Sequence, residues 1–408
     1  MRRILIFAYY SYRDPVFQSA VLPYFLNFPE RENYQFVLLT FEQARFKMPS
    51  QERREVAQHL LSHRIHWYQT TWHSGRFKLL KKAFDFIWGI LLATFLILRF
   101  RCRLIYSEAF PGAVLGHYLS RLTGCRHVVH SFEPHTDYMV ESGVWRVHSW
   151  EARLLRGHER ILGMHADALL TATYKNIENW RKQGSSARFV RVPSCVDLEH
   201  FSHSPEQRMK MRAQLGIKED EIALIYLGKF GGMYWDEELF TLFRACYRRA
   251  PELYHFIILS QDDLLKLREK LRAAGIPDER AHLAFVPLNQ VPAYLAASDM
   301  GICAVRQFPS KRYCSPIKDG EYWANGLPVA IPTGVSDDYE LTRENGLGVV
   351  IEETSTLGLE LAAEDIHKWF QQHQASEVRA RTRDFAARDR DVKVFRGVLN
   401  ELFVELIS

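Results

Sequence analysis

Short apolar runs recur along the chain, and longer amphipathic segments separate them. In the first half these runs are residues 4–8, 34–40, 103–107, 127–131, 168–172 and 188–192. Runs that are apolar at nearly every position are typical of parallel strands buried on both faces of a sheet. The intervening segments, such as 112–124 and 150–166, have the spacing of helices. This alternation predicts an α/β domain with a doubly wound parallel sheet.

A second series of apolar runs follows a polar, charged stretch at residues 202–221. These runs are residues 222–228, 254–260, 282–288, 300–305, 327–332 and 347–352. The polar stretch is typical of an interdomain link, so we expect two Rossmann-like domains in tandem that face a cleft. The expected boundaries are 1–203 for the first domain, 204–384 for the second, and 385–408 for a C-terminal helix that packs back on the first domain.

Composition excludes several classes of protein. The formal net charge of +5 is too small to indicate nucleic-acid binding by itself. The six cysteines are scattered without a CxxC pair, which argues against a zinc site and against a secreted disulfide framework. We therefore expect a protein of a reducing compartment, the cytoplasm, with no nucleic-acid partner.

Residues 76–103 combine an apolar run with basic flanks. The run at 86–98 is shorter than the roughly 20 residues that a bilayer span needs, and it lies far from the N-terminus, unlike a signal peptide. Two interpretations stay open. The segment is a buried helix of the first domain, or it is a helix on an anionic membrane surface, which would make the protein peripheral on the cytoplasmic face.

The stretch SPIKDGEYWANGLPVAIP, residues 315–332, predicts a helix that binds an anion. Ser315 can cap its N-terminus, Pro316 suits the first turn, and Gly326 can end it in a left-handed conformation. Lys318 stands in the first turn, where the helix dipole disfavours a cation unless an anion is its partner. Glu321 follows on the same face and can accept hydrogen bonds from a ribose diol. The alternative is an exposed Lys–Glu helix pair.

A second candidate stretch is IYLGKFGGMYWDEEL, residues 225–239. A buried strand leads into Gly228, Lys229 and Gly231. Glycines after a strand let the backbone approach a ligand, and Lys229 would offer a positive charge to phosphate. The spacing differs from those of the P-loop and dinucleotide motifs, and a plain turn is the alternative.

The third stretch is HVVHSFEPHTDYM, residues 127–139. A strand ends near His130, and Glu133, His135 and Asp137 follow it toward the expected cleft. The spacing matches no helical zinc motif, so we expect no metal here. His130 is predicted to contact the substrate, with a structural histidine as the alternative.

These stretches, in this order, resemble the GT-B glycosyltransferases of family 4 over nearly the whole chain. The resemblance also includes ADALLTATYKNIENW (166–180), RVPSCVDLEHF (191–201) and YLAASDMGICAV (294–305). It is most specific in the helix at 315–332, which is similar to the family's S-P-x-K-x-x-E-Y-x-A-x-G-x-P-V pattern. The chain departs from the family at Tyr313, where many members carry a Glu, and at Tyr234, where many carry a second Lys.

The resemblance implies a role for each candidate residue. Glu321 matches the carboxylate that binds the donor ribose, and Lys229 matches the basic residue that binds the diphosphate. His130 matches the histidine beside the sugar, and we add Glu133 as a second catalytic candidate. Lys318 is our candidate to replace the charge missing at Tyr234. The remaining donor-side candidates are Gly228, Gly231, Ser315 and Pro316, and the acceptor-side candidates are Tyr9, Tyr10, His135 and Asp137.

The implied reaction is transfer of a sugar from a nucleotide-diphosphate sugar, UDP or GDP being expected, to an acceptor hydroxyl. The resemblance implies retention of configuration and no required metal. The expected acceptor is a glycan or a lipid-linked or cell-surface glycan precursor. Three alternatives stay open: a sugar-nucleotide epimerase of the same fold, a non-catalytic nucleotide-binding homologue, and a membrane-associated scaffold.

Overall fold

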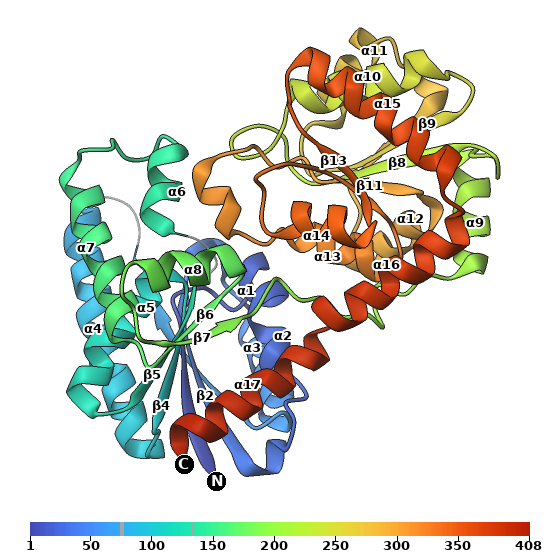
Figure 1. Ribbon diagram of the computed structural model, residues 1–408. Helices are drawn as coiled ribbons and strands as arrows, with labels where there is room; N and C mark the ends of the chain where they lie inside the picture. The colour runs from blue at the N-terminus through green and yellow to red at the C-terminus, as the bar shows by residue number, and fades with distance from the viewer. Residues whose placement is uncertain (74–76, 132–133) are drawn as a thin grey trace. The chain divides into compact units, whose positions relative to one another are not determined.

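The computed structural model describes residues 1–408 apart from 74–76 and 132–133 (Figure 1). The chain divides into two compact units. Unit 1 comprises Met1–Val192 and Val392–Ser408, and unit 2 comprises Pro193–Asp391. Each unit is built on one parallel sheet, in the strand orders β3-β2-β1-β4-β5-β6-β7 and β10-β9-β8-β11-β12-β13. The doubly wound α/β class expected from the apolar runs is confirmed in both units.

The strands of unit 1 follow the predicted runs, with one addition. They are β1 Arg2–Ala8, β2 Tyr34–Glu42, β3 Ile65–Thr71, β4 Leu104–Glu108, β5 Arg126–Ser131, β6 Ala168–Thr171 and β7 Arg188–Arg191. The sequence analysis did not predict β3. This strand lies at the edge of the sheet and is half-buried at most positions, so it lacks the continuous apolar run that marks a central strand.

Helices cover both faces of the first sheet (Figure 1). They are α1 Pro15–Ala20, α2 Leu22–Phe25, α3 Ser50–Ser62, α4 Lys78–Phe100, α5 Ala109–Thr123, α6 His135–Glu141, α7 Trp150–His165, α8 Tyr174–Lys182 and α17 Val392–Ile407. On one face α4 and α5 pack over Phe7, Val37 and Leu39. On the other face the α17 ring of Phe403 lies 6.1 Å from that of Tyr106 in β4.

All six predicted runs of the second half form strands in unit 2. They are β8 Ile222–Leu227, β9 Tyr254–Leu259, β10 Ala281–Ala284, β11 Met300–Ile302, β12 Val329–Pro332 and β13 Gly348–Ile351. The helices are α9 Pro205–Leu215, α10 Glu237–Arg249, α11 Leu264–Ala273, α12 Val291–Ala297, α13 Ile317–Ala324, α14 Asp338–Asn345, α15 Thr356–Gln372 and α16 Ala375–Asp389. Strand β10 ends four residues before the predicted run does, and this difference shapes the candidate site.

The unit boundary at Val192 and Pro193 differs from the expected boundary at residues 203 and 204. The segment between them is polar in part, but Val196, Leu198 and Phe201 are buried in the core of unit 2. Those three side chains tie the segment to unit 2. At the other end, α17 belongs to unit 1, where the Tyr34 hydroxyl lies 2.7 Å from the Asn400 side-chain oxygen. Unit 1 includes this helix from Val392, whereas residues 385–391 of the expected C-terminal segment belong to unit 2.

The apolar run at 86–98 belongs to a helix that is longer than the run itself. Helix α4 is 23 residues long, Lys78–Phe100. Its segment Leu80–Phe100 is long and apolar enough to cross a membrane by length and composition, and 28% of that window is buried inside the protein. The interpretation as an ordinary buried helix therefore describes only one of its faces.

Candidate functional site

A cavity of about 240 Å³ opens at the carboxyl ends of β8, β9 and β10. Ligands of open α/β sheets bind beyond the carboxyl ends of the strands, so this is the expected place for a site in unit 2. Glu321 of α13 contributes to the wall. The other lining residues are Leu227, Gly228, Leu259, Ser260, Gln261, Phe285, Val286, Leu288 and Val291.

Glu321 is the fifth of the eight residues of α13 and is half-buried. Removal from water raises the pKa of its carboxyl to about 7, and the nearby positive charge of Lys318 opposes that rise. Burial penalises the charged form of a carboxyl group. A donor to this carboxylate, such as a hydroxyl, would favour the charged form, so Glu321 is suited to accept hydrogen bonds from a ligand in the cavity.

Lys318 places its ammonium at the same wall. A Cβ atom on Gly228 would lie 3.0 Å from Lys318 Nζ and 2.9 Å from the Tyr226 hydroxyl. Gly228 also has a φ of +146°, where side chains are strongly disfavoured. The glycine therefore makes room for the lysine. Lys318 Nζ also lies 4.7 Å from the ring centroid of Tyr234, in cation–π contact.

The start of α13 differs from the prediction. The helix begins at Ile317 with Pro316 as its N-cap residue, and no side chain caps it. The expectation that Ser315 caps the helix was wrong. The Ser315 hydroxyl instead accepts from the Ser194 backbone N–H at 3.1 Å and from Arg390. At the other end Gly326 adopts a φ of +80° after the Asn325 cap, as predicted.

A buried charged network lies behind the first turn of α13. Arg390 is fully buried and donates to Asp338 and to Ser315. Asp319 is buried beside them, and burial, together with the nearby Asp338, raises its pKa well above the ordinary value. Its neutral form is thereby favoured.

The loop after β8 is held firmly against unit 2. Trp235 is buried and its backbone N–H donates to the Ala304 carbonyl at 2.9 Å. Gly231 has a φ of +76°, which a tight turn requires. Lys229 is exposed, and its carbonyl accepts the Tyr226 hydroxyl. The structure thus brings Gly228, Lys229 and Lys318 to one region.

His130 lies in the interior of unit 1. Its side chain has no exposed surface, and its Nδ1 lies 2.7 Å from the Tyr106 hydroxyl and 3.0 Å from Glu108 Oε1. Burial raises the pKa of Glu108. Strands β4 and β5 direct the His130 side chain into the core together with Glu108. Its role beside a sugar stays a prediction.

The remaining candidate site residues after β5 differ in their surroundings. Glu133 lies outside the described residues. The His135 ring stacks on Phe110, with centroids 5.4 Å apart, and burial lowers its pKa to about 4. Asp137 is half-exposed and pairs with Arg156 at 3.2 Å. His135 is therefore a neutral, packed histidine, whereas Asp137 is at the surface.

The two tyrosines after β1 have different surroundings. Tyr9 is 5% exposed, and its ring lies 4.4 Å from that of Trp72 and 5.5 Å from that of Phe86. The expectation that Tyr9 faces an acceptor was wrong, because α4 covers it. Tyr10 is half-buried, and its carbonyl accepts from the Phe41 N–H at 2.8 Å.

Metal ligation has no support among the residues that the structure describes. In that part of the chain no group of three or more His, Cys, Asp or Glu side chains is arranged to hold an ion. The described cysteines form no disulfide.

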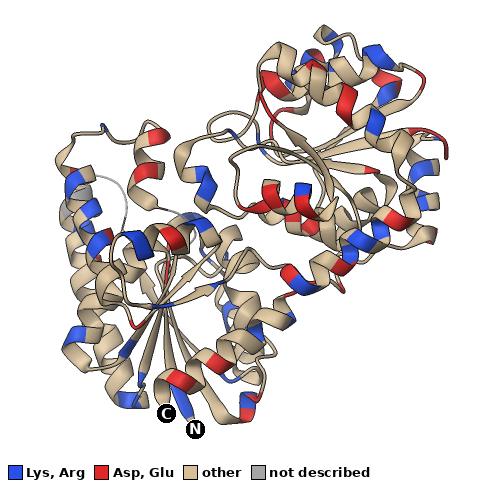
Figure 2. Ribbon diagram, viewed as in Figure 1, with Lys and Arg blue, Asp and Glu red and all other residues tan. Residues whose placement is uncertain are grey.

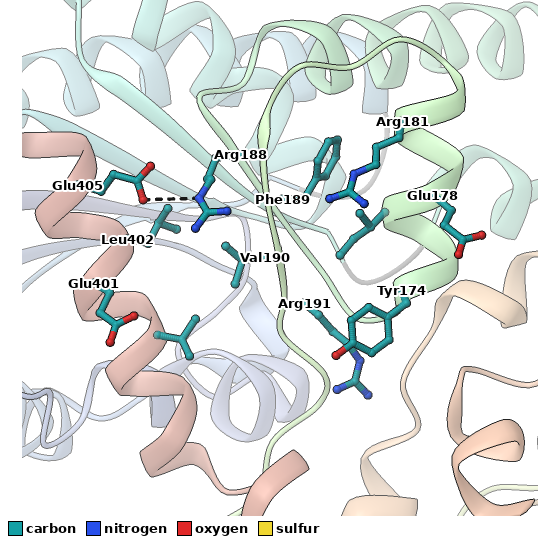
Figure 3. Close-up of a pocket in the computed structure, with 12 residues that line it drawn as sticks. Tyr174, Glu178, Arg181, Arg188, Phe189, Val190, Arg191, Glu401, Leu402 and Glu405 are labelled. Carbon is teal, nitrogen blue, oxygen red and sulfur yellow. Dashed lines mark ion pairs between the residues drawn. The ribbon is translucent and has the colours of Figure 1, made fainter. Parts of the chain in front are cut away.

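Unit 1 contains a second cavity, of about 500 Å³, along the edge strand β7 and between α8 and α17 (Figure 3). Three arginines and three glutamates contribute to its wall. The Arg188 Nε lies 3.5 Å from Glu405, the Arg181 guanidinium stacks 5.6 Å from the Phe189 centroid, and the Arg191 guanidinium 4.9 Å from that of Tyr174. These arginines have partners within the protein, so the cavity is not our candidate site.

Sequence reasoning missed one wall of the candidate site. Phe285, Val286 and Leu288 were assigned to a strand over 282–288, but β10 ends at Ala284 and these residues line the cavity. The Phe285 side chain is 69% exposed, unusual for an aromatic residue next to a strand. Pro287 was the available signal, because proline rarely continues a central strand.

Two parallel α/β units, with this cavity in the second, define the GT-B fold class, as predicted. No family model matches the chain. Its fold is similar to that of HepE from Anabaena, solved in complex with UDP, with a TM-score of 0.74, 15% identity and 100% of both chains covered. It is also similar to a glycosyltransferase from Rickettsia africae, with a TM-score of 0.71, 10% identity, and 100% of this chain and 99% of that chain covered.

One curated relative gives a sequence match. Over 196 residues the chain is 24% identical to a GDP-mannose-dependent alpha-(1-6)-phosphatidylinositol monomannoside mannosyltransferase of Mycolicibacterium smegmatis. The match covers 48% of this chain and 48% of that protein. The chain thus matches about half the length of this relative.

Proposed function

We propose that this protein is a glycosyltransferase that moves a sugar from a nucleotide-diphosphate sugar to an acceptor hydroxyl. The observation that carries the proposal is the cavity at the carboxyl ends of β8, β9 and β10, with Glu321 in its wall and the Lys318 ammonium beside Gly228. A carboxylate and a cation one helical turn apart suit the two polar parts of a nucleotide, its ribose and its phosphates.

The donor would occupy this cavity in a defined orientation. The volume of the cavity is below the roughly 300–1,000 Å³ of sites for drug-sized ligands. The cavity would therefore hold the base and ribose and leave the diphosphate outside. The Phe285 ring, 69% exposed, would cover the base. Glu321 would accept from the ribose hydroxyls. The diphosphate would lie at Gly228 against Lys318, the first-turn amides of α13 and Lys229.

The same residues would support bond breaking. When the bond between the anomeric carbon and the diphosphate oxygen breaks, negative charge grows on the leaving diphosphate. Fixed backbone N–H groups and lysine ammonium groups would stabilise that charge without a metal ion. The acceptor oxygen would form the new bond and lose its proton, and we propose that the anomeric configuration is retained, as the resemblance implies.

UDP-sugars and GDP-sugars are the donors that the comparisons favour. HepE was solved with UDP, and the mannosyltransferase is described as GDP-mannose-dependent. That relative acts on a phosphatidylinositol mannoside, which supports a lipid-linked glycan precursor as the acceptor. A lipid-linked acceptor would place the protein in the cytoplasm, in peripheral contact with a membrane.

A donor screen that measures released nucleotide tests the proposal. The full chain is incubated with UDP- and GDP-sugars, with and without glycan or lipid-linked acceptors, and thermal shifts are recorded with UDP, GDP and ADP. We expect one nucleotide to stabilise the protein and acceptor-dependent release from its sugar. Product formed without any acceptor would indicate an epimerase instead. Binding without turnover would indicate a non-catalytic homologue, and absence of any shift would contradict the donor site.

A further inference from the structure

Helix α4 exposes a stripe of large apolar side chains along its whole length. Their exposed fractions are 73% for Leu80, 57% for Phe84, 61% for Ile87, 49% for Trp88, 58% for Leu91, 57% for Phe95 and 70% for Leu98. The positions repeat at three and four residues, so they form one face of the helix. The stripe extends from Leu80 to Leu98, so at about 1.5 Å per residue this face is on the order of 30 Å long.

The opposite face holds the helix in place. Ala93 and Leu96 are fully buried against the sheet. Gly89 allows a close approach, because a Cβ there would lie 2.6 Å from the Phe41 ring. Asp85 is 1% exposed, and its carboxylate accepts from the His73 backbone N–H at 2.8 Å. The apolar stripe therefore cannot turn inward without emptying the core of unit 1.

Basic residues flank the stripe. Lys81 adjoins its start and is half-buried, and Arg99, Arg101 and Arg103 follow it and are exposed. The acidic residue of α4, Asp85, is buried, and α5 has no Asp or Glu in its sequence. The charges on this layer of helices can be followed in Figure 2. The face thus combines apolar surface with positive charge.

The neighbouring helix extends the same surface. Helix α5 packs beside α4 and exposes Tyr118 at 47% and Leu122 at 65%, with Arg121 exposed between them. Soluble proteins rarely leave contiguous apolar patches of this extent uncovered unless something binds them.

We infer that the α4–α5 face docks on an anionic phospholipid membrane, with α4 lying in the plane of the interface. Apolar side chains would enter the headgroup region while the three arginines meet lipid phosphates, as amphipathic interfacial helices do. The inference assigns a surface to the peripheral membrane contact proposed above and rests on it in that respect, but this surface uses none of the donor-site residues, so the two can be tested separately.

The fold argues against a membrane-spanning α4. The helix connects β3 and β4, which flank β2 and β1 in one sheet. Drawing α4 across a bilayer would expose Phe7, Val37, Leu39 and Phe41, which it now covers. Several apolar side chains would then lose their burial, and each loss would cost about 1.5–3 kcal/mol of stability.

Charge argues against a second copy of this chain as the occupant. In a two-fold symmetric contact the α4 helices run antiparallel or parallel. Because both ends of α4 are basic, either arrangement sets positive groups near positive groups. An anionic surface is complementary at both ends, whereas a second α4–α5 face is not.

The test is flotation of the full-length protein with vesicles of phosphatidylcholine, with and without phosphatidylglycerol. We expect binding that requires phosphatidylglycerol and weakens with salt. The double variant Arg99→Gln, Arg101→Gln should reduce binding roughly tenfold or more, because each basic residue near such a surface contributes a factor of about five. The double variant Leu91→Ser, Phe95→Ser should reduce vesicle binding by roughly a hundredfold.

Matched variants on unit 2 serve as controls. Leu265→Ser with Leu357→Ser removes two leucines that are 76% and 66% exposed, and Lys210→Gln with Lys266→Gln removes two exposed lysines. Neither control should change flotation. Equal binding by all variants would overturn the inference. The inference would also be overturned if the protein formed a dimer without lipid and the double variant Leu91→Ser, Phe95→Ser were monomeric. That result would show that a second copy covers this face. Thermal shifts with UDP and GDP report on the donor site independently in every variant.

Discussion

The ammonium of Lys318 lies 4.7 Å from the ring centroid of Tyr234. The resemblance to family 4 expects a second lysine at position 234, and the structure shows a lysine from another element held against the ring that replaces it. The positive charge is thereby supplied from the first turn of α13 instead of from the loop after β8. This contact supports the substitution that we inferred from the sequence, in which Lys318 compensates for the missing charge.

The Tyr234 ring is expected to orient Lys318 for phosphate. Replacing Tyr234→Leu should weaken binding of the responding nucleotide by about 1 kcal/mol, the order of a partly exposed cation–π contact. Tyr234→Phe keeps the ring and should leave affinity nearly unchanged. Isothermal titration calorimetry of both variants measures the difference. Equal losses in the two would mean that the hydroxyl, and not the ring, matters.

Lys318 itself is expected to carry a larger share of the affinity. Replacing Lys318→Met removes a cation beside the phosphates, and a charge-assisted contact is worth about 1.5–3 kcal/mol. The thermal shift with nucleotide should nearly disappear, while the stability of the free protein changes little. The control is Lys266→Met, an exposed lysine in the first turn of α11. A normal shift in Lys318→Met would contradict the proposed diphosphate position.

Nucleotide affinity should depend on pH through Glu321. Burial raises the pKa of this carboxyl to about 7, and the ribose is expected to bind its ionised form. Affinity should therefore rise as pH increases through about 7 and then level off. Calorimetry across this range tests the dependence, and Glu321→Gln should abolish both the dependence and most of the affinity. A pH-independent wild-type affinity would show that Glu321 does not contact the ligand.

The same pKa predicts an effect on stability with the opposite sign. The folded-state pKa of Glu321 lies above its ordinary value of 4.5, so the folded state holds the proton more tightly than the unfolded state. Stability from this group is present at low pH and is lost as pH rises through about 7. Glu321→Gln should then be more stable than wild type above pH 7, by about 1–2 kcal/mol once the full shift is discounted for the half-buried position of the side chain. Urea unfolding below and above that pH measures it.

Gly228 is expected to tolerate no side chain. Replacing Gly228→Ala would place a Cβ 3.0 Å from Lys318 Nζ and 2.9 Å from the Tyr226 hydroxyl, at a φ of +146°. We expect a loss of about 1–3 kcal/mol in stability and a smaller nucleotide shift, because Lys318 is displaced. Gly275→Ala is the control, with a φ of +79° and no atom within 4 Å. A nucleotide response reduced equally in both variants would show that strain alone explains the effect.

His130 is expected to support the fold of unit 1 more than the chemistry. Its replacement, His130→Asn, removes the contacts with Tyr106 and Glu108 and should cost about 1–3 kcal/mol in stability. Turnover per folded molecule should fall much less than the roughly 10²–10⁴-fold expected for loss of an acid–base group. Urea unfolding and released nucleotide measure the two effects. A turnover loss of that size in folded protein would instead support the sugar contact that the resemblance implies.

The strand content was predictable because central parallel strands are apolar at nearly every position. The runs at 222–228 and 254–260 become β8 and β9 with ends that differ by one residue. The edge strand β3 was missed because one side of an edge strand has no partner, and half-buried positions admit polar residues such as His66 and Gln69. Local pattern thus detects the centre of a sheet better than its margin.

Candidate residues were predictable where one short segment contains the whole relationship. Lys318 and Glu321 share a helix face by their spacing alone, and the structure keeps them beside one cavity wall. The burial of His130 and Tyr9 was not predictable, for a different reason. A position after a strand indicates which edge of the sheet a residue approaches, but not which element covers it. Helix α4 covers Tyr9, and the packing around Glu108 encloses His130.

The order of residues by itself determined the two α/β units, the α13 segment with its lysine and glutamate, and the basic, apolar character of α4, because these depend on spacings within a few turns or strands. Tertiary structure alone decided that Tyr234 faces Lys318, that Arg390 fastens Ser315 and Asp338 together, and that one side of α4 stays uncovered. The physical reason is separation along the chain: those contacts join residues that only packing brings together, and no local periodicity encodes them.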